Sequence, residues 1–239
     1  MSNIKLITFD LDDTFWEIGP VIIKAEIKTR EYIDSSLGEK INWGNMDEYL
    51  AIRKSLITEN PAMTYDLTLL RKGMMNHYLT PYFTSESAKN DLLDAAFDFF
   101  LAERHKVSFY EGVKDTLGEL AKAYSLGILT NGNADMKKLG MESYFDFSIS
   151  SEDVKSAKPE PGHFEKALEI STLEPANVLH IGDHQLCDMI GGIQSGFNVM
   201  WFNNKDMLWE YSTPKPEEFS TWKNGAKIIN SYIERLKNE

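Results

Sequence analysis

Two pairs of aspartates stand where the chain leaves a short apolar run. Asp10 and Asp12 follow the first of these runs, and Asp183 and Asp188 follow a later one. Side chains at positions i and i+2 of an extended segment point the same way, so Asp10 and Asp12 can share one pocket. Neighbouring carboxylates repel each other unless a cation or a shared proton relieves them. Aspartate also suits turns and helix N-caps, and the first pair taken by itself fits that structural role equally well.

The second pair shifts the balance toward a metal site. Asp183 comes directly after a predicted strand, and Asp188 stands at the next helical turn. Mg²⁺ is a hard cation that takes oxygen ligands, and proteins hold it with few carboxylates together with phosphate and water. We expect Asp10 and Asp183 to be its side-chain ligands and Asp188 to support them from behind.

Two further segments could hold a phosphate group. Thr130 ends a predicted strand with a hydroxyl group, and Asn131 adds an amide beside the flexible Gly132. Lys158 precedes two prolines that stiffen its loop, which suits an ammonium group that must be aimed. Its charge would neutralise both a transferring phosphoryl group and a carboxylate nucleophile.

The apolar pattern predicts the elements that position these residues. Short runs rich in β-branched and aromatic residues predict strands over 4–9, 125–130, 147–150, 178–182 and 198–202. Helical spacing predicts helices over 112–123, 161–170, 188–195 and 226–236. Strands that alternate with helices favour an α/β fold, a parallel sheet with helices on both faces. Functional groups of such sheets collect beyond the carboxyl ends of the strands, so the polar clusters should meet at one edge.

The stretch between the first two strands differs in character. It carries helical spacing, as in 21–33 and 90–101, and no strand pattern. We therefore expect two domains: an α/β core of residues 1–17 and 107–239, and an all-helical insertion of residues 18–106.

The composition limits the compartment and the partners. The chain has 239 residues and a net charge of −12, which repels nucleic acids and anionic membrane surfaces, so neither is expected as a partner. No run approaches the roughly 18 apolar residues of a membrane span, and the first residues do not resemble a secretory signal. Cys187 stands alone and cannot form an internal disulfide, which favours a reducing, cytoplasmic location. Nothing in the pattern indicates the oligomeric state.

Taken in order along the chain, these motifs resemble those of the haloacid dehalogenase superfamily. The matching residues are Asp10 and Asp12 after the first strand, Thr130 at a strand end, Lys158 before a proline, and Asp183 with Asp188 five residues on. They span nearly the whole chain, and Asp13 stands where glycine is commoner in the superfamily. The resemblance implies a Rossmann-like parallel sheet core and a small helical cap domain inserted after the first strand.

The resemblance also implies a role for each motif residue. Asp10 resembles the nucleophile that takes the phosphoryl group. Asp12 resembles the general acid and base, with its backbone carbonyl on the metal, and Asp183 resembles a metal ligand. The residues that match the phosphate-positioning group are Thr130, Asn131 and Lys158. True haloacid dehalogenases need no metal and lack an acid at the Asp12 position, so Asp12 favours a Mg²⁺-dependent phosphoric monoester hydrolase with an aspartyl-phosphate intermediate.

Finer features favour a substrate class. The segments that carry this likeness are 9–14, 65–71, 129–133 and 179–183, which together look like bacterial phosphatases of flavin mononucleotide and 5-amino-6-(5-phosphoribitylamino)uracil. Arg71 could then meet a polar ring edge or a phosphate, although a surface ion pair fits it equally well. The alternatives are a nucleotide or sugar-phosphate phosphatase, a metal-independent 2-haloacid dehalogenase and a non-catalytic phosphate-binding protein. The expected partner is a small phosphorylated metabolite.

Side chains beside the motifs are expected to have supporting roles. Trp16 stands just past the Asp10 loop and is expected to line the substrate pocket. His180 lies inside a predicted buried strand and is expected to be a satisfied core residue rather than a base. Neither His180 nor His184 has a spacing that suggests zinc.

Overall fold

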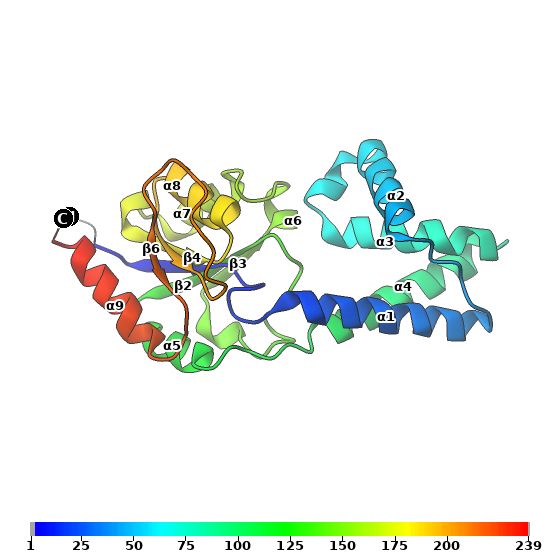
Figure 1. Cartoon of the computed structure of the whole chain (residues 1–239), viewed down its shortest axis with the longest axis horizontal. Coiled ribbons are helices and arrows are strands. Elements are labelled where there is room, and N and C mark those ends of the chain that lie inside the picture. The colour runs from blue at the N-terminus through cyan, green and yellow to red at the C-terminus, as the bar shows by residue number, and fades with distance from the viewer. Residues whose placement is uncertain (1–2, 239) are drawn as a thin grey trace. The chain divides into compact units, whose positions relative to one another are not determined.

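The computed structural model describes residues 3–238 of the chain (Figure 1). The chain divides into two compact units. One unit comprises Met1–Glu17 and Ser108–Glu239, and the other comprises Ile18–Val107. We call the first the α/β unit and the second the helical unit.

The α/β unit is built on one parallel sheet, as the alternation of strands and helices predicts. Within residues 3–238 the sheet has six strands in the order β3-β2-β1-β4-β5-β6, and every neighbouring pair runs parallel. The strands are β1 (Leu6–Phe9), β2 (Ser125–Thr130), β3 (Phe147–Ser150), β4 (Val178–Gly182), β5 (Asn198–Phe202) and β6 (Glu217–Phe219). The predicted Rossmann-like α/β fold is confirmed, and β6 is an addition that the apolar pattern did not predict.

Strand β1 lies in the middle of this sheet, between β2 and β4. Phe9, its last residue, pairs with Ile128 of β2 and Ile181 of β4. Every residue of β1 is buried, as expected of a strand covered on both faces. The residues that follow β1, β2 and β4 therefore leave the sheet side by side at one edge.

Helices cover both faces of the sheet. They are α5 (Val113–Leu120), α6 (Ser151–Val154), α7 (Gly162–Ser171), α8 (Gly191–Gln194) and α9 (Gly225–Leu236). Figure 1 shows α7 and α8 on one face, and α5 and α9 on the other. Between these helices and the strands, short 3-10 turns occupy Glu142–Tyr144 and Pro175–Asn177.

The segment after β4 differs from the α-helix predicted over 188–195. It begins earlier, as a π-helical turn over Gln185–Ile190, and continues into α8. The His184 imidazole caps this turn, because its Nδ1 accepts hydrogen bonds from the backbone N–H groups of Leu186 (3.2 Å) and Cys187 (3.1 Å). This polar start carries no apolar periodicity, so the predicted boundary falls too late.

The helical unit has helices where the spacing over 21–33 and 90–101 predicts them. Its α-helices are α1 (Ile18–Leu37), α2 (Met46–Glu59), α3 (Leu67–Leu79) and α4 (Glu86–Arg104), with 3-10 turns at Pro61–Thr64 and Thr80–Tyr82. Helices α1 and α4 pack along each other (Figure 1). The side chains of Asn45, Asp66 and Ser85 cap the starts of α2, α3 and α4 by accepting a backbone N–H. The unit buries its own apolar core, which includes Leu79 and Phe100.

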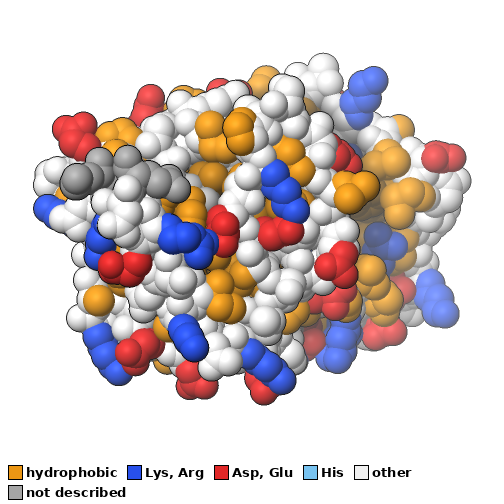
Figure 2. Space-filling model, turned by 60° about the vertical axis from the view of Figure 1, so that its left-hand side comes forward, with side chains coloured by type: hydrophobic (Ala, Val, Ile, Leu, Met, Phe, Trp, Pro, Cys, Tyr) orange, Lys and Arg blue, Asp and Glu red, His pale blue; other side chains and the backbone are white. Residues whose placement is uncertain are grey.

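The surplus of acidic residues is distributed over the surface. On the face shown in Figure 2, acidic and basic side chains are interspersed with small apolar areas. Several exposed pairs lie one helical turn apart, such as Lys122 with Glu119 and Lys166 with Glu169, each at 2.7–2.8 Å. Among the described helices, none is long and apolar enough to span a lipid bilayer.

Candidate active site

The chain turns sharply after β1 and carries Asp10 and Asp12 to the edge of the sheet. The backbone N–H of Asp10 donates to the carbonyl of Ile181 (2.9 Å), which extends the pairing with β4 by one residue. Asp13 then adopts a φ of 61°, a left-handed conformation that aspartate tolerates better than most residues with a side chain. This conformation accounts for the glycine that is commoner at this position in the superfamily the chain resembles.

Trp16 holds Asp12 and does not line a substrate pocket. Its indole Nε1 donates to Asp12 Oδ1 (2.9 Å), and the Trp16 side chain is fully buried. The indole ring packs edge-on against Phe109, with ring centroids 5.4 Å apart. The prediction that Trp16 lines the pocket is therefore wrong. A buried tryptophan N–H needs a hydrogen-bond acceptor, and here the acceptor is the carboxylate of Asp12.

Lys158 joins two carboxylates at the centre of the site. Its Nζ lies 2.9 Å from Asp10 Oδ1 and 2.6 Å from Asp188 Oδ1, and it also donates to the carbonyl of Leu129. Burial by itself would lower the pKa of Lys158, but the charges of Asp10 and Asp188 outweigh burial and raise it. Lys158 is therefore a buried ammonium ion at neutral pH, and its charge offsets part of the repulsion between the carboxylates.

Asn131 fixes the backbone of the lysine loop. Its Nδ2 donates to the carbonyl of Lys158 (3.0 Å), and its Oδ1 accepts the backbone N–H of Lys158 (2.8 Å). The same oxygen accepts the hydroxyl group of Ser151 (3.0 Å). Both ends of the Asn131 side-chain amide therefore position Lys158, and its expected contact with phosphate oxygens stays a prediction.

Both carboxylate oxygens of Asp188 accept hydrogen bonds. Its Oδ1 accepts from Lys158 Nζ and lies 3.3 Å from His180 Nε2, and its Oδ2 accepts the backbone N–H of His184 (3.0 Å). Burial would raise the pKa of Asp188, but the charge of Lys158 and the His180 contact lower it, so the carboxylate is ionised. A Cβ atom at Gly182 would lie 2.3 Å from the Asp188 carboxyl carbon, so glycine is required there.

Asp183 has few partners for its carboxylate. Thr14 Oγ1 donates to its Oδ1 (3.3 Å), and Trp201 Nε1 donates to its backbone carbonyl (2.7 Å). Burial, reinforced by the charges of Asp188 and Asp10, raises the pKa of Asp183 to about 8. Burial and the charge of Asp188 likewise raise the pKa of Asp10 to about 7, although Lys158 opposes this.

A bound cation would offset the repulsion among the clustered carboxylates of Asp10, Asp183 and Asp188. Carboxylate oxygens of Asp10, Asp183 and Asp188 lie within 4.8 Å of one another. Three hard oxygen donors, two of them on groups whose pKa is raised, fit a small divalent cation and give it net negative surroundings. Both oxygens of Asp188 already accept hydrogen bonds, so Asp10 and Asp183 are the side chains better able to turn an oxygen to the metal. The expected ligand carbonyl of Asp12 belongs to the same loop as Asp10.

Thr130 lies where a phosphate oxygen could meet its hydroxyl group. Thr130 Oγ1 accepts the backbone N–H of Gly132 (2.9 Å), which shapes the turn after β2, and this bond leaves the hydroxyl hydrogen for another acceptor. The Thr130 carbonyl lies 3.1 Å from His163 Nε2. Burial and the charge of Lys158 lower the pKa of His163 to about 4, so its imidazole is neutral.

The sequence pattern did not predict that Thr8 and His180 support the Asp188 carboxylate. Thr8 Oγ1 lies 2.9 Å from His180 Nδ1, and the other ring nitrogen of His180 reaches Asp188. His180 is buried, as predicted, but it also orients a carboxylate of the site. The available signal was that Thr8 and His180 are polar residues on two buried strands, and the sheet makes them direct register partners.

Known proteins are similar to this chain in sequence and in fold. The chain is 27% identical over 210 residues to 5-amino-6-(5-phospho-D-ribitylamino)uracil phosphatase YigB of Escherichia coli, a match that covers 87% of this chain and 88% of that protein. It is 30% identical over 201 residues to pyrophosphatase PpaX of Bacillus mycoides, covering 81% of each chain. A solved structure described as a 2-haloacid dehalogenase from Pseudomonas syringae superposes with a TM-score of 0.88 at 32% identity, covering 96% of this chain and 99% of that one.

A family profile extends over most of the chain. The profile of the haloacid dehalogenase-like hydrolases matches residues 4–196, a range that includes every motif residue from Asp10 to Asp188. The resemblance inferred from the motifs is thus confirmed by the profile, by the relatives and by the fold. The chain belongs to the haloacid dehalogenase-like hydrolases.

Proposed function

We propose that this protein is a Mg²⁺-dependent phosphatase that hydrolyses small phosphate monoesters through an aspartyl-phosphate on Asp10. The observation that carries the proposal is the position of Lys158 Nζ, 2.9 Å from Asp10 Oδ1, beside three clustered carboxylates. Phosphoryl transfer requires positioning and neutralisation of charge, and this group of residues supplies both. Catalysis belongs to the α/β unit (1–17 and 107–239), and the helical insertion (18–106) selects the ester as a cap.

The chain's own residues account for two displacement steps. An Asp10 oxygen bonds to phosphorus while the bond from phosphorus to the ester oxygen breaks, and Asp12 gives the leaving alcohol a proton. In the second step Asp12 takes a proton from water, the water oxygen bonds to phosphorus, and Asp10 is released. Lys158 and the Thr130 hydroxyl position the phosphoryl oxygens. When bound by Asp10, Asp183 and the Asp12 carbonyl, Mg²⁺ supplies positive charge that stabilises the transferring group.

Asp12 distinguishes this function from dehalogenation. Similarity to the Pseudomonas syringae structure makes a 2-haloacid dehalogenase the second candidate. A dehalogenase leaving group is a halide ion, which needs no proton, whereas an alkoxide leaving group does. The Trp16 N–H fixes one Asp12 oxygen at 2.9 Å, which supports Asp12 as a positioned acid and base.

For the substrate we propose an ester of the riboflavin pathway, such as flavin mononucleotide or a phosphoribitylamino-uracil. The supporting observation is the match to YigB over most of both chains. Nucleotides and sugar phosphates are the alternative, and the similarity to PpaX adds inorganic pyrophosphate to the compounds worth testing.

The test is release of phosphate from a panel of esters, with Mg²⁺ and with a chelator. We expect Mg²⁺-dependent release that Asp10→Asn abolishes without changing the melting temperature by more than a few degrees. Asp13→Asn is the matched control, because it removes a neighbouring carboxylate and asparagine also tolerates the φ of 61° at this position. Its turnover should remain near that of the wild type.

Three outcomes would contradict the proposal. Halide release from 2-chloropropionate in the presence of chelator, without phosphate release from any ester, would assign the dehalogenase reaction. Tight binding of phosphate esters without cleavage by the folded protein would assign a binding role. Turnover in Asp10→Asn, with contamination and deamidation excluded, would refute Asp10 as the nucleophile.

A further inference from the structure

The helical unit contains a recess with both charged and aromatic walls. Its outer chamber has a volume of about 300 Å³, and an inner pocket of about 20 Å³ continues from it. Both spaces share the side chains of Glu26, Arg30, Trp43, Tyr49 and Arg71. The outer volume lies at the small end of the range for ligand pockets and suits one or two rings.

Two polar groups at this recess are buried and unused. Among the described residues, Arg71 Nε and the Tyr78 hydroxyl have no hydrogen-bond partner, and both residues line the inner pocket. The rest of the Arg71 guanidinium is fixed by an ion pair with Glu26 and by the Phe100 ring, whose centroid lies 3.8 Å from Arg71 Cζ. Leaving a buried donor unsatisfied costs free energy of folding. A ligand acceptor that formed a hydrogen bond with Arg71 Nε would recover that free energy.

The recess is locally positive in an acidic protein. Arg30 and Arg71 face the single carboxylate of Glu26, and Arg30 Cζ lies 5.1 Å from the centre of the Trp43 ring. Burial, together with the nearby charge of Arg104, lowers the pKa of Arg71 to about 10, so the guanidinium remains charged at neutral pH. A ligand that presents acceptors to two arginines and a donor to Glu26 would match this set.

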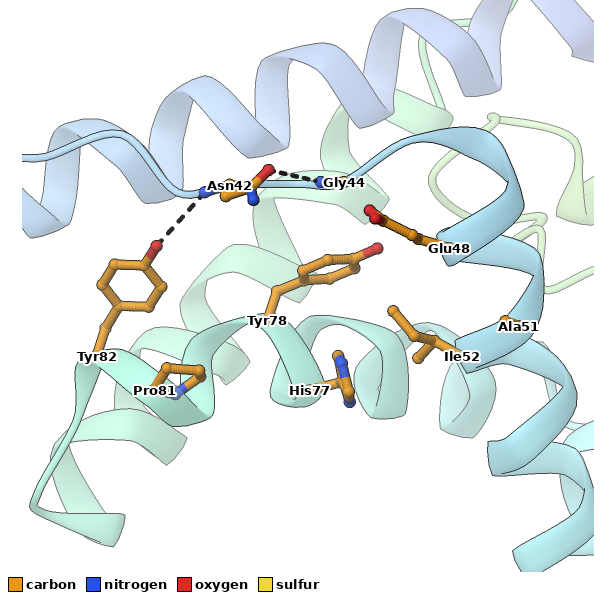
Figure 3. A pocket seen from close by; sticks show the side chains of 9 residues that line it. All are labelled: Asn42, Gly44, Glu48, Ala51, Ile52, His77, Tyr78, Pro81 and Tyr82. Carbon is orange, nitrogen blue, oxygen red and sulfur yellow. Dashed lines mark hydrogen bonds between the residues drawn. The ribbon is translucent and has the colours of Figure 1, made fainter.

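A second pocket of the helical unit also has Tyr78 in its wall, but none of its described lining residues is an arginine. It is larger, about 470 Å³, and Figure 3 shows Tyr78 pointing across it toward Glu48. Two of its polar groups are already engaged: Tyr82 Oη accepts the N–H of Asn42 (3.4 Å), and Glu48 accepts the N–H of Asn45 (3.0 Å). Tyr78 lines both spaces, so it is the unpartnered Nε of Arg71 and the second guanidinium group, Arg30, that favour the recess over the pocket of Figure 3.

We propose that the recess at Arg71 binds a planar ring whose edge presents carbonyl, N–H and carbonyl groups in that order, as pyrimidinediones do. Arg71 and Arg30 donate to the two carbonyl oxygens, Glu26 accepts the N–H between them, and Trp43 and Tyr49 provide apolar walls for the ring. The inference rests on the proposed function where it assigns this ring to the leaving group of the ester. The same edge could also belong to a free nucleoside that acts as an effector.

The binding test uses wild-type protein in chelator with two nucleosides that carry no phosphate. Uridine has the complete edge, and 3-methyluridine differs by one methyl group on the central nitrogen. Uridine should raise the melting temperature and give a measurable heat of binding, whereas 3-methyluridine should do neither. Equal responses to both nucleosides, or no response to either at millimolar concentration, would overturn the proposal. A buried water molecule would then be the simplest occupant of the inner pocket.

Variants locate the ring within the helical unit. Arg71→Lys keeps the charge but removes the planar fork and Nε, and it should weaken uridine binding about tenfold. His77→Gln changes an exposed side chain of the pocket in Figure 3 and should leave the binding constant unchanged. If Arg71→Lys does not fold, the comparison of the two nucleosides on wild-type protein still decides the question.

Kinetics separate a leaving group from an effector. If the recess binds the leaving group, uridine competes with uridine 5′-monophosphate, and Arg71→Lys lowers the preference for this ester over ribose 5-phosphate. If it binds an effector, uridine alters turnover of ribose 5-phosphate without competing. Uridine binding that discriminates against the methyl group, in a protein that hydrolyses no ester, would refute the proposed function and retain the ring site. Hydrolysis of esters by a protein that does not distinguish uridine from 3-methyluridine would retain the proposed function and refute the ring site.

Discussion

Lys158 Nζ and Asp10 Oδ1 lie 2.9 Å apart, in a site where both side chains are almost completely withdrawn from solvent. Burial raises the pKa of Asp10 to about 7, and the charge of Lys158 limits this rise by favouring the ionised carboxylate. The same ammonium group bonds to the ionised Asp188, so one cation serves both carboxyl groups. Under the proposed function, stability and catalysis therefore depend on the same side chain.

Replacing Lys158 by methionine should affect both properties. We expect turnover to fall at least about 100-fold, because positive charge on the phosphoryl group is lost. The free energy of unfolding should fall by about 3 to 5 kcal/mol near neutral pH, because the ionised and buried Asp188 carboxylate loses its counter-ion. Lys158 lowers the pKa of Asp188, so its contribution is present above the unfolded pKa of that carboxyl and disappears in acid. Denaturant melts across the pH range would show whether the deficit of the variant shrinks toward acid.

Mg²⁺ should stabilise the protein more as the pH rises. In the metal-free fold Asp10 and Asp183 have a pKa raised to about 7 and about 8, so they hold protons that the unfolded chain has released. Stability of the metal-free protein therefore falls as pH increases from about 4 to about 8. Mg²⁺ binds the ionised forms, so the rise in melting temperature that it causes should be larger at about pH 8 than at about pH 5.5.

The variant Asp183→Asn tests the same response to Mg²⁺, because it removes one of the two expected side-chain ligands. In chelator at about pH 8 it should melt at a higher temperature than the wild type, because an uncompensated buried charge is removed. It should also lose the response to Mg²⁺. Asp146→Asn removes an exposed carboxylate and should keep that response. A Mg²⁺ shift that is equal in Asp183→Asn and the wild type would show that the cation binds elsewhere.

Trp16→Phe should slow turnover while leaving ester binding nearly intact. Phenylalanine keeps an aromatic ring against Phe109 but removes the N–H that fixes Asp12. We expect kcat to fall about tenfold, as is common when a partner that orients a catalytic group is lost. The pH dependence of kcat should change as well, because the acid and base limbs of the profile report on Asp12. An unchanged profile in Trp16→Phe and in Asp12→Asn would contradict the acid and base role.

Asn131→Ala should misplace Lys158. The substitution removes the two hydrogen bonds that hold the Lys158 backbone, and small displacements of a catalytic group can cost about 100-fold in rate. Ser151→Ala is the matched control, since it removes one outer bond to Asn131 and leaves both bonds to Lys158. We expect a large loss of kcat in the first variant and a small one in the second. Comparable losses in both would indicate a general effect on stability.

Much of the α/β unit could be predicted because its strands are apolar runs bounded by polar residues. Strands β2 to β5 lie where the pattern places them. Strand β6, by contrast, is Glu-Glu-Phe at the sheet edge, where Phe219 is buried and the two glutamates face solvent. One buried side chain gives no alternation to detect, so the pairing with β5 is a tertiary effect.

The site was predictable in its residue types and less so in its contacts. Asp10, Lys158 and Asp188 converge because parallel strands bring their carboxyl ends to one edge. The bonds from Trp16 to Asp12 and from Asn131 to Lys158 depend on loop conformations, such as the positive φ of Asp13, that periodicity does not encode. Spacing identifies residue types at an edge, whereas side-chain direction requires the folded loops.

The central position of β1 also bears on the order in which the protein can assemble during synthesis. Among the described strands of the sheet, β1 is translated before its neighbours β2 and β4, which follow much later in the chain. The helical unit is one uninterrupted stretch and can close its own core while the ribosome is still producing the rest. The Asp10 site includes Asp183 and Asp188, which follow β4, so under the proposed function a nascent chain would remain inactive until β4 has joined the sheet.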